Sequence, residues 1–143
     1  MGMAAEYDPR YLAGIQHFNR REFFEAHEVW EDLWRECRPE DRRFYQGLIQ
    51  AAVALHHWGN GNWRGTHRLF HSGRTYMSAY PVPYQGLDIG SFWREMEQAI
   101  ADVLKDAPPG DSARLDPARA PTIALDPLPA RWPAVGEDAT LDH

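Results

Sequence analysis

At 143 residues, 43% of them hydrophobic, the chain is long enough to bury the core of one domain without disulfides or structural metal ions. The net charge of −6 argues against a nucleic-acid-binding protein, which usually carries a clustered excess of basic residues. The single cysteine, Cys37, excludes an intrachain disulfide and suits a reducing compartment. No apolar run reaches the roughly 20 residues needed to span a bilayer, and no signal peptide opens the chain. We therefore expect a cytoplasmic protein that does not insert into membranes.

Five helices are predicted from the helical spacing of apolar residues and from signals that start and stop helices. Asp8 is the expected N-cap of the first helix, with Pro9 at its first position. Pro39 ends the second helix, the Gly59–Gly61 turn ends the third, and Pro81 ends the fourth. The fold class is therefore all-α, an irregular and mostly antiparallel bundle. The predicted helices span residues 8–19, 21–37, 39–58, 62–80 and 88–104.

The C-terminal segment differs in composition from the rest of the chain. Residues 106–143 hold seven of the eleven prolines and little helical periodicity. They also contain Ile123, Leu125 and Trp132, apolar side chains that a solvated tail does not need. We therefore expect a bundle domain of residues 1–105 and an extended, proline-rich strap of residues 106–143 packed on the same domain. Ile123, Leu125 and Trp132 are its predicted anchors.

The second predicted helix carries a polar stripe beside its core stripe. At 100° per residue, Phe24, His27, Glu31 and Trp34 follow one another along the helix next to the apolar positions. A histidine and a carboxylate thus lie one turn apart between two large aromatic residues. A pair in such surroundings is partly removed from water and needs polar partners.

The third predicted helix is apolar on nearly all sides, so we expect it to be central. Its exception is a narrow strip of Gln46, Gln50 and His57. Short loops make the second and third helices antiparallel neighbours. The sequence therefore predicts that Gln50 and His57 approach His27 and Glu31 in one buried polar cluster.

Three interpretations of this cluster remain open. It can be a structural hydrogen-bond network that fixes helix register, in which case Glu31→Ala should destabilise the fold by roughly 3–5 kcal/mol. It can be a divalent metal site of His27, Glu31 and His57, with Glu28 as a further ligand. The sequence His-Glu-x-x-Glu, however, differs from both the Glu-x-x-His and the His-Glu-x-x-His metal motifs. It can also be a metal-free site for acid–base chemistry or a small ligand.

The fourth predicted helix carries a basic band opposite its core stripe. Arg64, His67, Arg68, His71 and Arg74 share that side in an otherwise acidic chain. A solvated helix face is the first interpretation, and a face that binds an anion or an acidic partner is the second.

Two segments resemble a known family. The string from Phe23 to Trp34 resembles the opening signature of domain-of-unknown-function family 309, and residues 47–57 followed by 61–65 resemble its second signature. The family consists of small, all-helical prokaryotic proteins without an established activity, so the resemblance implies a fold and a site but no reaction. On matching positions it points to His27, Glu28, Glu31, Trp34, Gln50, His57 and Asn62 as the polar binding cluster.

From these observations we expect a non-catalytic helical protein that binds a small molecule or a protein partner through the polar cluster. The alternative is a metal-dependent, hydrolase-like enzyme that uses His27, Glu31 and His57, with a divalent metal ion as its cofactor. Neither nucleic acid nor a membrane is an expected partner, and a homo-oligomer is left open.

Overall fold

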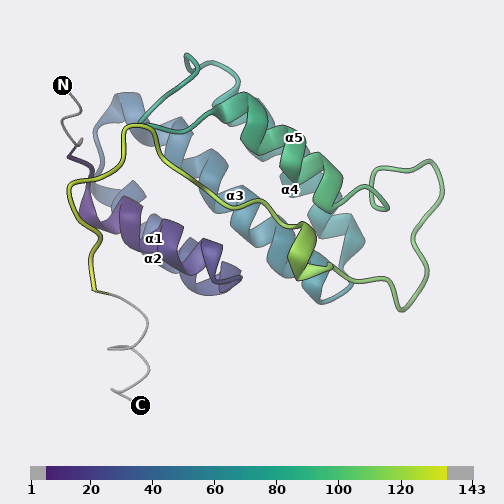
Figure 1. Ribbon diagram of the computed structural model, residues 1–143. Helices are drawn as coiled ribbons and strands as arrows, with labels where there is room; N and C mark the ends of the chain where they lie inside the picture. Colours follow the sequence, from purple (N-terminus) through teal and green to yellow (C-terminus); the bar gives the residue numbers. More distant parts are fainter. Residues whose placement is uncertain (1–5, 135–143) are drawn as a thin grey trace.

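The structure, a computed structural model, describes residues 6–134 and confirms the all-α class (Figure 1). The described residues contain no β-strand, and the backbone pairing of Tyr84 with Leu87 is an isolated bridge. None of the helices in this part of the chain is long and apolar enough to cross a membrane. The helices are α1 (Pro9–Asn19), α2 (Phe23–Glu36), α3 (Arg42–Gly59), α4 (Trp63–Met77) and α5 (Ile89–Ala99), with short 3-10 turns η1 (Pro39–Asp41) and η2 (Pro117–Arg119).

Helix α3 is central, as its apolar sequence predicts, with α2 packed on one side and α4 on the other (Figure 1). Helix α1 packs against α2, where the Trp30 indole nitrogen donates to the Tyr11 carbonyl at 3.1 Å. Helix α5 closes the core. Its Phe92 ring lies 5.9 Å from the ring of Phe18 in α1, and its Trp93 ring lies 5.6 Å from that of Phe70 in α4. Such aromatic pairs hold three helices around one core.

Two helices end three or more residues earlier than predicted. Helix α4 ends at Met77 instead of Tyr80, and α5 ends at Ala99 instead of Leu104. After Ala99 the chain continues in turns, with the Val103 amide donating to the Ile100 carbonyl at 2.8 Å. Ile100 and Val103 are nevertheless buried. The apolar spacing that suggested a longer helix therefore reflects the burial of these two side chains. Here a series of turns buries them as a helix would.

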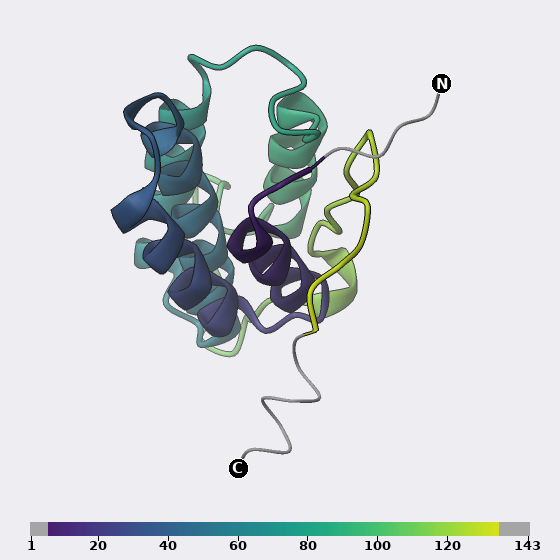
Figure 2. The same cartoon turned by 90° about the vertical axis from the view of Figure 1, so that its left-hand side faces the viewer.

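The proline-rich segment lies along the helices as an extended strap (Figures 1 and 2). Ile123 and Leu125 are buried in the core, as predicted for two of the three anchors. The Asn19 side chain holds the Ile123 backbone at both ends, donating to its carbonyl at 3.0 Å and accepting from its amide at 2.8 Å. Arg21 donates to the carbonyls of Ala120 and Pro121 at 2.8 and 2.7 Å. Polar groups of the α1–α2 turn thus fix the position of the strap.

The prediction of Trp132 as the third anchor is wrong, because 39% of this residue remains exposed. The buried residue of this stretch is Pro129, while Trp132 borders an open cavity together with Tyr7 and Leu12. After Pro129 no further described residue of the strap is buried, so the chain has left the core before it reaches Trp132. Residues 1–5 and 135–143, the ends of the two predicted segments, lie outside the described residues, and the division at Lys105 stays a prediction.

Candidate functional site

The predicted polar stripe of α2 is only partly covered, with 17% of the His27 side chain exposed. His27 Nε2 is 3.2 Å from a Glu31 carboxylate oxygen, and the other Glu31 oxygen accepts from Arg35 at 3.2 Å. His27 Nδ1 lies 2.7 Å from the Phe24 carbonyl, so both ring nitrogens face acceptors. The Glu31 side chain is 37% exposed, and Glu28 is exposed. The pair forms as predicted, but water reaches it.

Trp34, the last residue of that stripe, is covered by α3. The Arg42 guanidinium lies 4.2 Å above its ring. At the other end of α2, the Phe24 ring lies 5.3 Å from the ring of His56. These two contacts define the α3 face that meets α2, and its histidine is His56 rather than His57.

Gln50 and His57 instead face α4. Gln50 accepts a hydrogen bond from the Ser72 hydroxyl, and the Asn62 amide lies 3.4 Å from His57 Nδ1. Asn62 also caps α4 by accepting from the Gly65 amide at 3.1 Å. The prediction of one cluster containing His27, Glu31, Gln50 and His57 is therefore wrong.

The reason lies in the close packing of α3 on α4. Both helices have glycines at their contact: a side chain at Gly47 would overlap Met77, and one at Gly73 would meet Gln50 and Trp93. Close approach of two backbones favours this face of α3 as the α4 side. The polar strip lies on it and finds its partners there.

The predicted metal site is not assembled either. Among residues 6–134, no group of three or more histidine, cysteine, aspartate or glutamate side chains is arranged to hold a metal ion. His27 and Glu31 meet each other on α2, whereas His57 meets Asn62 at the start of α4. Glu28 adds no contact to either pair. Two of the predicted ligands thus lie together on α2, and the third lies where α3 meets the start of α4.

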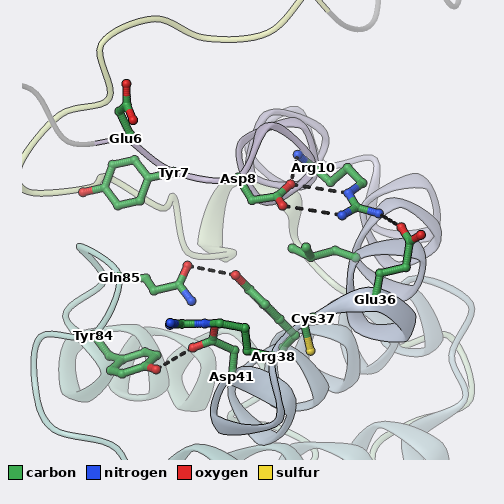
Figure 3. A pocket seen from close by; sticks show the side chains of 12 residues that line it. Glu6, Tyr7, Asp8, Arg10, Glu36, Cys37, Arg38, Asp41, Tyr84 and Gln85 are labelled. Atoms are coloured by element: carbon green, nitrogen blue, oxygen red, sulfur yellow. Dashed lines mark hydrogen bonds and ion pairs between the residues drawn. The ribbon is translucent and has the colours of Figure 1, made fainter.

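A cavity of about 590 Å³ lies elsewhere, where the beginning of α1 meets the end of α2 (Figure 3). The chain between α4 and α5 contributes Tyr84 and Gln85, and η1 contributes Asp41. Leu33 and Cys37 form part of its wall. The remaining lining residues are polar or aromatic: Glu6, Tyr7, Asp8, Arg10, Glu36, Arg38 and Tyr45.

Asp41 is the most enclosed carboxylate of this cavity, with only 6% of the residue exposed. The Tyr84 hydroxyl donates to one of its oxygens at 2.5 Å, and Arg38 lies 3.4 Å from the other (Figure 3). Burial, followed by the hydrogen bond and charge of Asp41, raises the pKa of Tyr84 to about 12. The phenol therefore stays protonated at neutral pH and holds the carboxylate in place.

Two further networks shape the walls. Arg10 contacts Asp8 at 3.4 Å and also pairs with Glu36, which joins the start of α1 to the end of α2 (Figure 3). The Tyr45 hydroxyl donates to the Gln85 side-chain oxygen at 2.9 Å, and burial raises the pKa of that phenol. These contacts fix the side chains before any ligand arrives.

The charges of the cavity do not balance. Four carboxylates (Glu6, Asp8, Glu36 and Asp41) share it with only two guanidinium groups, Arg10 and Arg38. Tyrosine faces and carboxylates together attract cations. The Cys37 thiol donates to the Trp34 carbonyl at 3.3 Å, and burial raises its pKa, which opposes formation of a reactive thiolate.

Sequence reasoning missed these residues, apart from identifying Asp8 as a helix cap. Cys37 is the last residue of the predicted second helix, and the structure leaves it half-buried. The available signal was local: Asp41 follows Pro39 in a short connection between two helices. Nothing local indicates that Tyr84, 43 positions later, reaches its carboxylate.

The comparisons with known proteins agree with the resemblance. Residues 11–69 match the family described as "Domain of unknown function (DUF309)". Over 101 residues the chain is 33% identical to "Uncharacterized protein YpuF" of Bacillus subtilis (strain 168). The aligned region covers 68% of the chain and 58% of that protein. It is 28% identical over 93 residues to an "Uncharacterized protein" of Aquifex aeolicus (strain VF5), covering 64% of the chain and 28% of that protein. The chain thus spans less than two thirds of either relative.

Proposed function

The chain carries a DUF309 domain, and because the function of that family is unknown we propose from the cavity alone that the protein is a cytoplasmic, non-catalytic binder of a small amine-bearing cation. The observation that carries this proposal is the enclosed Asp41 carboxylate, which Tyr84 orients toward a cavity with an excess of negative charge. Each Asp41 oxygen can accept more than one hydrogen bond, so an ammonium group can donate to this carboxylate beside Tyr84 and Arg38.

The size and the walls of the cavity fit a ligand of this class. A volume of about 590 Å³ lies within the range of roughly 300–1,000 Å³ that is usual for small-molecule sites. Tyr7, Tyr45 and Tyr84 line the cavity and provide aromatic surface that an alkyl chain or a cation can contact. Glu6, Asp8 and Glu36 lie in the same cavity and can meet a second positive group.

The protonation of the site favours binding over catalysis. A general acid or base works best when its pKa lies near the working pH. Burial moves the pKa values of Tyr45 and Tyr84 upward, away from neutrality, and it raises the pKa of the Cys37 thiol. These groups are therefore suited to hold a ligand rather than to exchange protons with it.

Isothermal titration calorimetry with spermidine at low ionic strength tests the proposal. The wild-type protein should bind one equivalent with saturation, and succinate should give no signal. Asp41→Asn keeps an oxygen to accept from Tyr84 but removes the charge, so affinity should fall at least tenfold, as expected for the loss of a charged hydrogen bond worth about 1.5–3 kcal/mol.

Asp111→Asn is the matched control because it changes the net charge equally at an exposed position outside the cavity. It should leave the spermidine affinity within about twofold of wild type. Equal weakening by both variants would mean that the polyamine responds to overall charge, and the cavity would lose its assigned role. Absence of saturable binding to the wild-type protein would contradict the proposal directly.

A further inference from the structure

A second recess, of about 730 Å³ and open to solvent, lies along the face of α4 that turns away from the core. Its lining combines Arg43 of α3 with Arg68, His67 and His71 of α4. Hydroxyl groups of Ser72, Thr75 and Tyr76 complete it, and no carboxylate belongs to the lining. In a chain of net charge −6 this is a local concentration of basic groups.

The two arginines of this recess have no acidic partner among the described residues. Arg10, Arg35, Arg38 and Arg74 each form an ion pair with a carboxylate. Arg43, in contrast, stacks its guanidinium 4.9 Å above the Tyr76 ring. Arg68 is exposed and forms no ion pair with a carboxylate within residues 6–134.

The groups are also held in position. Stacking on Tyr76 restrains the Arg43 guanidinium while its in-plane N–H groups stay available, the arrangement that recognises phosphate oxygens. The His67 and His71 rings lie 4.5 Å apart, edge to face. The Ser72 hydroxyl is fixed by its hydrogen bond to Gln50 on α3. The recess is therefore built from two helices whose packing sets its shape.

We propose that this recess, lined by Arg43, Arg68, His67 and His71, is a binding site for a small phosphate-bearing anion. A short ligand confines its charge to the recess, whereas a long polyanion would extend beyond it over a molecule of net charge −6. The site is independent of the Asp41 cavity, with which it shares no lining residue.

Isothermal titration calorimetry with inorganic pyrophosphate at pH 7 tests this site. The wild-type protein should bind with saturation and near one equivalent. Arg43→Gln and Arg68→Gln should each weaken binding at least tenfold, because each removes a charged donor from the recess. Arg94→Gln is the matched control: Arg94 is an exposed arginine on α5 outside the recess and should leave the affinity within twofold.

Circular dichroism melts of all three variants should match the wild-type melt, since the substituted side chains are exposed. Should either arginine variant fail to fold, Arg43→Lys or Arg68→Lys keeps the charge but not the forked geometry and should still weaken binding measurably. No saturable binding by the wild-type protein, or an equal loss in Arg94→Gln, would overturn the proposal. So would tighter binding, per phosphate, of a single-stranded oligonucleotide, which would assign the surface to a polymer.

Discussion

The Glu31 carboxylate shows how strongly the exposure of one side chain governs its energetic contribution. From the sequence it is a partly buried partner of His27, and breaking a buried charged pair costs roughly 3–5 kcal/mol. In the structure the same pair forms, but the Glu31 side chain is 37% exposed and also contacts Arg35, itself on the surface. Helical spacing predicts which residues are neighbours. It does not predict whether another helix covers these neighbouring residues.

Glu31→Ala should therefore lower the free energy of unfolding by less than about 1 kcal/mol, the range of exposed ion pairs. Urea denaturation of the variant and the wild-type protein measures the difference. Glu28→Ala, at an exposed position on the same helix, is the control and should change stability by less than about 0.5 kcal/mol. A loss above 2 kcal/mol for Glu31→Ala would show that the pair is effectively buried in solution.

At the scale of helices, the sequence predicts much of the fold because apolar spacing and caps are local signals. Asp8 caps α1 as predicted, accepting from the Arg10 amide at 2.8 Å. The polar partners of Gln50 could not be predicted in this way. They depend on which face of α3 meets α4, and close packing at Gly47 and Gly73 accompanies that choice. Likewise, the Asp41 cavity needs a connecting segment to fold back from 43 positions away.

The contact between α1 and α2 should tolerate no side chain at Gly14. A Cβ there would overlap the Trp30 indole, whose nitrogen is engaged with the Tyr11 carbonyl at 3.1 Å. Gly14→Ala should therefore lower the free energy of unfolding by about 1–3 kcal/mol, the usual effect of overpacking a core. Gly59→Ala, with no atom within 4 Å of the added carbon, should be neutral or slightly stabilising in the same urea melts. Equal stability of the two variants would mean that Trp30 can move aside.

At the scale of the whole molecule, the strap packs on the helical bundle and completes its hydrophobic core. Ile123 and Leu125 are 4% and 3% exposed, and the Asn19 side chain of α1 forms hydrogen bonds with both the amide and the carbonyl of Ile123. The sequence predicted these two anchors because apolar residues in a proline-rich segment need a surface to cover. It failed for Trp132, since hydropathy does not tell where an extended chain leaves that surface.

Ile123→Ala and Leu125→Ala should each destabilise the protein by about 2–4 kcal/mol, because each leaves an unfilled space in a packed core. Leu128→Ala removes an equally apolar side chain, but one that is 67% exposed. The melting temperature of this variant should therefore stay close to that of the wild type. Thermal melts followed by circular dichroism give the ranking. Binding of the dye ANS at 25 °C should increase only for the two buried positions, if loosening the strap exposes the helices beneath it. Three identical melts would instead mean that the bundle is stable without the strap, and that its core is complete at the end of the fifth helix.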